Sequence, residues 1–142
     1  MGSEMCIRDR AYEQIRDNGS ISLFKSYNSK YRDGEQKRDF IYVKDCAEVL
    51  LQFLTSQNLT GIFNLGTSQA RSFNSLAKAV FSAMGKPVKI NYIDMPEEIR
   101  PNYQYFTEAD MSKLETFSDK LEFTSLEDGV RDYVENHLKS EI

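Results

Sequence analysis

Six basic side chains lie within twenty residues and form the densest chemical feature of the chain: Lys25, Lys30, Arg32, Lys37, Arg38 and Lys44. Only three acids in this stretch offset them: Asp33, Glu35 and Asp39. Such a cluster can bind a small anion such as a phosphate or pyrophosphate, because lysine and arginine donate charge-assisted hydrogen bonds to its oxygens. The alternative is a solvated loop whose charges only keep the segment in water.

Other candidates for chemistry are few. The seven glycines make neither the G-x-G-x-x-G turn of a dinucleotide site, nor the G-x-x-x-x-G-K-[ST] loop, nor the G-x-S-x-G elbow of a serine hydrolase. Cys6 and Cys46 lack a C-x-x-C spacing, so we expect no disulfide framework and no zinc site, and we interpret Cys46 as a small core residue. The single histidine, His137, is interpreted as a surface residue. Glu97 and Glu98 suit a helix start better than an acid/base pair, because adjacent helical residues do not face one another.

Composition limits the class of protein. The 142 residues are 40% hydrophobic and 12% aromatic, enough for one globular core and too few for two. The net charge is −4, divided into +4 over residues 1–93 and −8 over residues 94–142. Without a global positive field we expect no nucleic-acid partner. No apolar run approaches the roughly 18 to 20 residues of a membrane span and no secretion signal is evident, so we expect a cytoplasmic protein with no membrane partner.

Short apolar runs predict the strands, at 21–27, 40–43, 61–66 and 88–94. The first two are expected to pair across the basic loop. The third is almost continuously apolar between two glycines, which suits a strand buried on both faces of a parallel sheet. Such a strand needs neighbours on both sides.

Helical periodicity and capping residues predict the helices. A short helix is expected at 11–18. Asp45 is expected to cap the next helix, whose face packed on a sheet carries Ala47, Leu50, Leu51 and Leu54. A third helix is expected to begin at Ser72 or Asn74 and to end at Gly85.

Two S/T-x-x-D patterns, at 107–110 and 125–128, are capping boxes that predict two further helix starts. The last helix is expected to bury five apolar residues: Leu126, Val130, Tyr133, Val134 and Leu138. Strands alternating with helices indicate an α/β fold. Residues 1–10 show no periodicity and are interpreted as a non-native head, which leaves 11–142 as the native region.

Four strings carry a resemblance: GSISLFKSY at 19–27, DGEQKRDFIYVKD at 33–45, GIFNLGT at 61–67 and PEEIRPNYQYFTEAD at 96–110. Together they resemble the ADP-L-glycero-D-manno-heptose 6-epimerase family of the extended short-chain dehydrogenases/reductases, within the NAD-dependent epimerases and dehydratases. The R-D-F-[IV]-Y-V-x-D and G-x-F-N-[LI]-G strings are shared widely among sugar-nucleotide enzymes. The combination with F-K-S-Y and N-Y-Q-Y-F-T-E-A-D is much narrower. The resemblance covers about residues 11–138.

The resemblance implies the C-terminal part of an extended Rossmann-type enzyme: the substrate-binding region with a strand and helices of the parent sheet. It implies epimerisation of ADP-D-glycero-D-manno-heptose at C6 by transient NADP-dependent oxidation, for lipopolysaccharide core precursors, in an enzyme that is a homo-oligomer. The cofactor fingerprint and the Tyr-x-x-x-Lys pair of the family lie upstream. No tyrosine here has a lysine four residues on, so no catalytic or cofactor-binding residue is carried over.

What the resemblance does carry over is a set of substrate contacts. Its members are the stretch that wraps the sugar nucleotide, the arginine at its phosphates and a substrate-binding tyrosine: Phe24, Lys25, Ser26 and Tyr27, then Arg38, then Tyr103. A forked, permanently charged guanidinium suits a diphosphate, and a phenol can stack and hydrogen-bond at once. Without the resemblance, these residues would be interpreted as an edge-strand aromatic set, a surface arginine and a core tyrosine.

Two alternatives stay open at this point. One is another NAD(P)-dependent enzyme acting on a UDP-, GDP- or dTDP-sugar, and the other is a non-catalytic sugar-nucleotide-binding protein. In every case the 61–66 strand would lack its neighbours in this chain. We therefore expect the 142-residue chain alone to be unstable, prone to aggregation and inactive.

Overall fold

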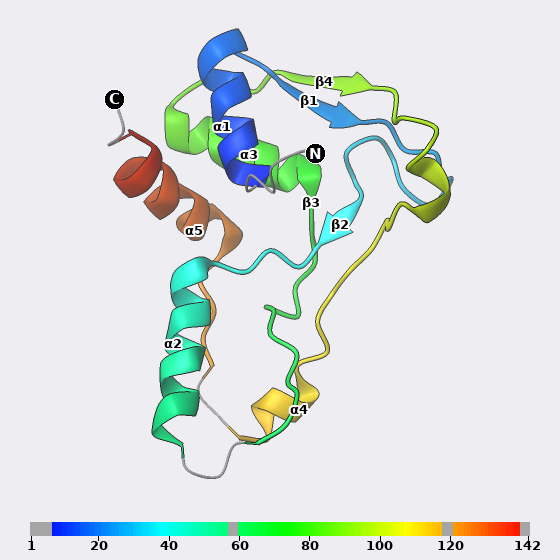
Figure 1. The fold of residues 1–142 in the computed structure, drawn as a ribbon. Coiled ribbons are helices and arrows are strands. Elements are labelled where there is room, and N and C mark those ends of the chain that lie inside the picture. The colour runs from blue at the N-terminus through cyan, green and yellow to red at the C-terminus, as the bar shows by residue number, and fades with distance from the viewer. Residues whose placement is uncertain (1–6, 57–59, 118–120, 140–142) are drawn as a thin grey trace.

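The computed structural model describes residues 7–56, 60–117 and 121–139 (Figure 1). Residues 1–6 of the predicted head, Cys6 among them, lie outside these ranges. The elements follow in the order α1 Ile7–Asn18, β1 Ile21–Phe24, β2 Lys37–Arg38, α2 Val43–Thr55, β3 Arg71–Ser72, α3 Phe73–Met84, β4 Ile90–Ile93, the 3-10 helix η1 Arg100–Asn102, α4 Ser112–Glu115, α5 Leu126–Tyr133 and the π-helix η2 Val134–Leu138. Each helix in the described ranges is too short or too polar to span a bilayer.

The main core lies where α1, α3 and the α5–η2 helix pack together (Figure 1). From α3 it takes Leu76, Val80 and Phe81, whose i, i+4, i+5 spacing places them on one face. The helix begins and ends as predicted. Ser72 Oγ accepts the Ser75 N–H at 3.2 Å, and Gly85 ends the helix with a φ of +64°.

The last predicted helix is confirmed, but its predicted burial only in part, since Leu126 and Leu138 are partly buried against the core and Tyr133 is not in it. Ser125 caps α5 by accepting the Asp128 N–H at 3.1 Å, and Val130 and Val134 are fully buried in the main core. The other predicted capping box is wrong. Asp110, the acid of that pattern, accepts the Ser112 N–H at 3.0 Å instead of folding back on Thr107, and the next helix, α4, begins only at Ser112.

The strands form two small sheets. β1 pairs in parallel with β4, with Ile21 opposite Ile90, and β2 pairs antiparallel with β3, with Lys37 opposite Ser72. The predicted pairing of 21–27 with 40–43 is therefore wrong. Residues 40–42 are extended without a partner strand, because Tyr42 already caps α2 and its carbonyl accepts the Cys46 N–H at 3.2 Å.

Two expectations about α2 are corrected. Asp45 does not cap the helix; it lies buried inside it and accepts two hydrogen bonds from Thr124, from the backbone N–H at 2.8 Å and from Oγ1 at 2.7 Å. The face predicted to pack on a sheet is exposed instead: Ala47, Leu50, Leu51 and Leu54. Val49, one residue off that face, is the apolar residue that α2 buries.

The 61–66 segment forms no strand, contrary to prediction. Ile62 is 88% exposed, because no strand in the described residues lies beside it to pair with its backbone or cover its faces. At the other end of the chain, α1 begins at Ile7 rather than at residue 11. Residues 7–10, assigned above to the head, form its first turn.

Candidate binding site around Arg38

Backbone hydrogen bonds on both sides hold Arg38 in place. Its neighbour Lys37 donates its N–H to the Tyr105 carbonyl at 2.9 Å and accepts the Thr107 N–H at 3.2 Å. On the opposite edge, Arg38 pairs with Arg71 of β3. The strand that carries Arg38 is thereby fixed between the start of α3 and the segment that carries Tyr103.

Asp39, the next residue, fixes the same strand through its side chain. Oδ1 accepts the Thr67 N–H at 2.8 Å and the Thr67 hydroxyl at 2.5 Å. Oδ2 accepts the N–H groups of Ser68 at 3.1 Å and Ala109 at 3.0 Å. Burial acts to raise the pKa of Asp39, but these hydrogen bonds outweigh it and lower the pKa. Gly66 must lack a side chain here, because a Cβ would meet the Asp39 carboxylate.

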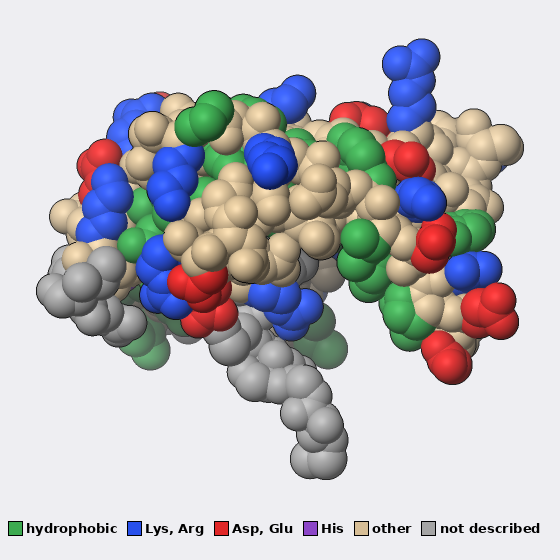
Figure 2. Space-filling view, turned by 90° about the horizontal axis from the view of Figure 1, so that it is seen from above, with side chains coloured by type: hydrophobic (Ala, Val, Ile, Leu, Met, Phe, Trp, Pro, Cys, Tyr) green, Lys and Arg blue, Asp and Glu red, His purple; other side chains and the backbone are tan. Residues whose placement is uncertain are grey.

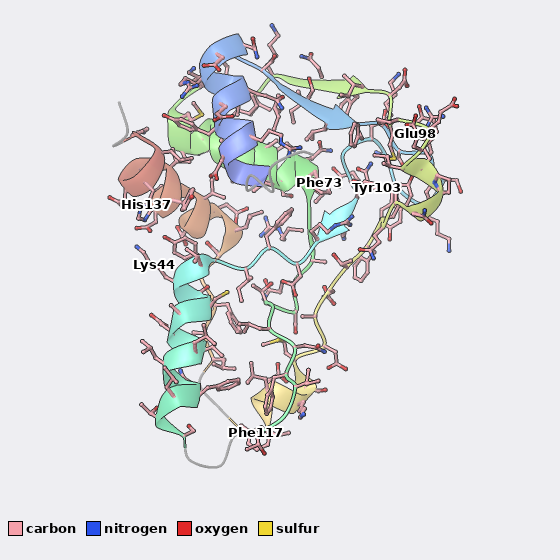
Figure 3. All side chains as sticks on the ribbon, in the orientation of Figure 1. Lys44, Phe73, Glu98, Tyr103, Phe117 and His137 are labelled. Carbon is pink, nitrogen blue, oxygen red and sulfur yellow. The ribbon has the colours of Figure 1, made fainter. Side chains whose placement is uncertain are left out.

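The Arg38 guanidinium lies between two aromatic rings. Its Cζ is 5.5 Å from the centroid of the Tyr103 ring and 5.7 Å from that of Phe73, and Figure 3 shows these two residues near β2. One nitrogen, Nη1, donates to the Lys37 carbonyl at 2.8 Å. Arg38 makes no ion pair with any carboxylate in the described part of the chain. Its charge is therefore free to pair with an anionic ligand.

A cavity of about 430 Å³ opens beside this guanidinium. The residues of its wall that bear on binding are Phe24, Gln36, Arg38, Phe73, Ile93 and Tyr103. A second, open hollow lies on the other side of Tyr103 and also includes Arg38, together with Glu98 and Asn102. Arg38 and Tyr103 thus form the partition between two connected concavities.

Another cavity, of about 530 Å³, lies away from Arg38, between the 67–71 and 121–126 segments. Its one basic wall residue, Arg71, is already paired with Glu127 at 2.5 Å. We place the candidate site at Arg38 because an unpaired cation and an apolar wall meet there. Over the face seen in Figure 2, lysine and arginine side chains are spread among acidic ones rather than gathered in one patch.

Three of the six predicted contacts meet in the cavity: Phe24, Arg38 and Tyr103. Tyr103 is half-buried. Burial raises the pKa of Tyr103, although the nearby Arg38 charge lowers it in part. The phenol therefore stays protonated and can donate a hydrogen bond.

The other three predicted contacts lie beside the cavity and are occupied within the chain. Lys25 Nζ and Tyr27 Oη both donate to Asp94 Oδ1, each at 3.0 Å. Ser26 donates its hydroxyl to the Asn28 carbonyl at 3.0 Å. The hydrogen bond that Lys25 donates to Asp94 raises the pKa of Lys25, and the hydrogen bonds that Asp94 accepts from Lys25 and Tyr27 lower the pKa of Asp94.

Tyr27 is nevertheless joined to the cavity through other tyrosines. Its backbone N–H donates to the Tyr105 hydroxyl at 3.1 Å, and the Tyr105 ring meets that of Tyr103 edge-on at 5.1 Å. The Tyr27 ring itself lies 4.0 Å from the Arg100 guanidinium. Tyr27 is thus linked to Tyr103 through Tyr105, but it does not line the cavity that Arg38 and Tyr103 share.

Sequence reasoning did not identify three residues of this region. Phe73 was expected only within a helix, Asp39 only as an offsetting charge, and Gln36 not at all. The signal for Asp39 and Gln36 was present, since both belong to the string Q-K-R-D-F around Arg38. Phe73 is 35 residues from Arg38 in the sequence, and no local pattern connects them.

Comparison with known proteins finds a family model that matches part of the chain. Residues 7–66 match the NAD dependent epimerase/dehydratase family. An ADP-L-glycero-D-manno-heptose-6-epimerase of Nitratidesulfovibrio vulgaris is 49% identical over 138 residues, which are 97% of this chain and 42% of that protein. One of the same name from Fusobacterium nucleatum is 43% identical over 136 residues, 92% of this chain and 41% of its own length. The chain thus spans about two fifths of these relatives.

Solved structures superpose on this chain. A Helicobacter pylori ADP-L-glycero-D-manno-heptose-6-epimerase superposes with a TM-score of 0.70 at 26% identity, covering 90% of this chain and 36% of that one. A UDP-N-acetylglucosamine 4-epimerase from Methanobrevibacter ruminantium gives a TM-score of 0.79 at 22% identity, covering 99% of this chain and 41% of that one, which supports the fold alone. The predicted α/β fold class, that of part of an extended Rossmann-type fold, is confirmed.

Proposed function

We propose that the protein is the substrate-binding part of a heptose epimerase of the NAD dependent epimerase/dehydratase family, whose model residues 7–66 match. The proposed reaction converts ADP-D-glycero-D-manno-heptose to ADP-L-glycero-D-manno-heptose by inversion at C6, for lipopolysaccharide core precursors. The similarity over 97% of the chain to a protein of that name supports it. That the enzyme is cytoplasmic and a homo-oligomer also stays a proposal.

The observation that carries this proposal is the unpaired Arg38 guanidinium between the rings of Phe73 and Tyr103, on the wall of a cavity of about 430 Å³. A guanidinium donates two parallel hydrogen bonds to phosphate oxygens, and the flanking rings restrict its orientation. The Tyr103 hydroxyl, kept protonated by burial, adds a donor for the same ligand. Phe24 supplies an apolar surface for the rest of it.

The proposed reaction needs a nicotinamide cofactor, which the family name implies and which we propose to be NADP; such a cofactor reversibly removes a hydride from the substrate. The described residues do not fit a dinucleotide site. After β1 the chain continues into Lys25–Tyr27 and after β4 into Asp94, and neither strand leads through a glycine turn into a helix. We therefore assign this chain a role in holding substrate and no step in the redox chemistry.

The test is Arg38→Ala in the complete gene product. We expect the affinity for ADP-D-glycero-D-manno-heptose to fall by about 2 to 3 kcal/mol, roughly 30- to 150-fold, through loss of charge-assisted contacts. Isothermal titration calorimetry measures it. The matched control is Arg32→Ala, which removes an exposed arginine of the same basic cluster and should change affinity less than twofold.

An unchanged affinity in Arg38→Ala would remove Arg38 from the site. The same titration with UDP-glucose, GDP-mannose and dTDP-glucose separates the heptose epimerase from other sugar-nucleotide enzymes. If one of these binds more tightly than the ADP-sugar, the proposed substrate is wrong, although the Arg38 site stands.

A further inference from the structure

Gln36 is the buried polar residue of the Arg38 cavity. It is 1% exposed, and it is one of the residues that line the cavity, together with Phe24 and Arg38. Its Nε2 donates to the Phe24 carbonyl at 3.3 Å. Its Oε1 has no hydrogen-bond partner among the described residues. One half of this carboxamide is therefore bonded and the other half is not.

Backbone hydrogen bonds hold the segment that carries Gln36 in place. The Gln36 carbonyl accepts the Phe73 N–H at 3.2 Å, and the next residue, Lys37, donates to Tyr105 at 2.9 Å. Two residues earlier, the Gly34 carbonyl accepts the Asn74 N–H at 3.0 Å. Since these bonds hold the segment from both sides, Gln36 stays on the cavity wall.

Another buried amide of the molecule shows what full pairing looks like. Asn74 Nδ2 donates to the Asp33 carbonyl at 3.0 Å and to Glu35 Oε1 at 2.6 Å, and Oδ1 accepts the Tyr92 hydroxyl at 3.0 Å. A buried carbonyl oxygen without such a partner has given up its hydrogen bonds to water and gained none in return, which destabilises the folded state. An apolar side chain of the same length would avoid that cost at position 36, so the acceptor needs an explanation.

We propose that Gln36 Oε1 accepts a hydrogen bond from a hydroxyl group of the ligand that occupies the Arg38 cavity. This inference rests on the proposed function, in which Arg38 binds the diphosphate. An acceptor oxygen repels phosphate and attracts a hydroxyl, so the cavity has a cationic end and an acceptor end. The ligand therefore carries hydroxyls next to its phosphates, as both the ribose and the sugar of a sugar nucleotide do.

The test compares Gln36→Met with the unmodified complete gene product. Methionine keeps the length of the side chain and removes the acceptor, together with the Nε2 donor to the Phe24 carbonyl. Isothermal titration with pyrophosphate, ADP and ADP-mannose measures the affinity for the diphosphate, for the diphosphate with ribose, and for both with a pyranose. We expect pyrophosphate to bind equally to the two proteins, and ADP-mannose to bind about tenfold more weakly to the variant.

The ADP titration identifies the hydroxyl. A loss shared by ADP and ADP-mannose assigns it to the ribose, and a loss with ADP-mannose alone assigns it to the sugar. Equal binding of all three ligands to variant and unmodified protein overturns the inference. If ADP-mannose binds the unmodified protein and Arg38→Ala abolishes that binding, the proposed function survives this failure.

A second measurement applies if Gln36→Met fails to fold. The unmodified protein is titrated with 2′-deoxy-ADP, 3′-deoxy-ADP and deoxy analogues of ADP-mannose. Removal of the hydroxyl that Gln36 accepts should weaken binding about tenfold in one of these ligands. Uniform affinity across the series would exclude the contact.

Discussion

The two apolar clusters of the molecule differ in what covers them. In the main cluster, α3 is enclosed by α1 on one side and by α5 and η2 on the other (Figure 1). In the smaller cluster, Val49 of α2 meets Met111 and Leu114, with only partly buried residues around them. The outer face of α2 is left open, and Leu54 is 83% exposed.

The difference shows that hydrophobic periodicity predicts an apolar helix face but not what covers that face. Both α2 and α3 carry apolar residues at helical spacing, and the pattern correctly indicates that each helix has an apolar face. It does not identify the partner of that face. The face of α3 finds its partners within the chain, whereas that of α2 finds none among the described residues.

The sharpest contrast is between two phenylalanines. Phe81 is fully buried in the main cluster, and Phe117, at the far end of the molecule (Figure 3), is 53% exposed. We expect Phe81→Ala to lower the free energy of unfolding by about 3 to 5 kcal/mol, through lost burial and a cavity. Phe117→Ala is the matched control and should cost less than about 1 kcal/mol. Urea unfolding of the complete gene product measures both, and equal losses would show that the clusters are equally covered.

Asp39 joins the Arg38 strand to the segments of the smaller cluster, and its removal should have the next largest effect. Asp39→Ala leaves the N–H groups of Thr67, Ser68 and Ala109 without their acceptor, at an expected cost of about 2 kcal/mol. Asp39→Asn keeps one acceptor oxygen and should lose less. Urea unfolding gives the stability. If Asp39→Ala is as stable as the unmodified protein, the strand is held by its backbone alone.

Local signals predicted what short segments determine. The caps at Ser72 and Ser125 and the helix end at Gly85 follow from neighbouring residues and are confirmed. The burial predicted for the last helix is confirmed fully at Val130 and Val134. The prediction of a strand at 61–66 is wrong, because such a strand needs neighbouring strands and none of the described residues forms one beside it.

The residues of the candidate site divide in the same way, into those that sequence strings predicted and those that only the fold brings together. Three of its residues, Phe24, Arg38 and Tyr103, came from strings that mark a family, and the structure brings them to one cavity. Their role in binding substrate stays a prediction. Phe73 and Gln36 join them only through long-range packing, so composition and spacing could not place them.

The open face of α2 gives a prediction of association rather than of stability. The 142-residue chain should self-associate through this face, since exposed apolar patches drive association. Leu50→Lys with Leu54→Lys should reduce that association and change stability by less than about 0.5 kcal/mol, because both side chains are already exposed. Val49→Lys is the control, since it places a charge in the smaller cluster. Sedimentation velocity measures the association. If the unmodified chain is a monodisperse monomer that melts cooperatively, the prediction is contradicted.

The junction between the two regions predicts a small dependence of stability on pH. Lys44, at the start of α2, donates to Asp132 of α5 at 2.7 Å, and Tyr42 donates to the same oxygen. These bonds, Lys44 first, lower the pKa of Asp132 from 3.8 to about 2. A carboxyl whose pKa is lower in the folded state stabilises it above about pH 4, and the contribution is lost as the pH falls to about 2.

Asp132→Asn should therefore be slightly less stable than the unmodified protein at pH 6, and the difference should shrink towards pH 2.5. Tyr42→Phe, which keeps Lys44, should show part of the effect. Urea unfolding at the two pH values measures it, and a difference that does not change with pH would mean that Asp132 titrates alike in the folded and unfolded chain.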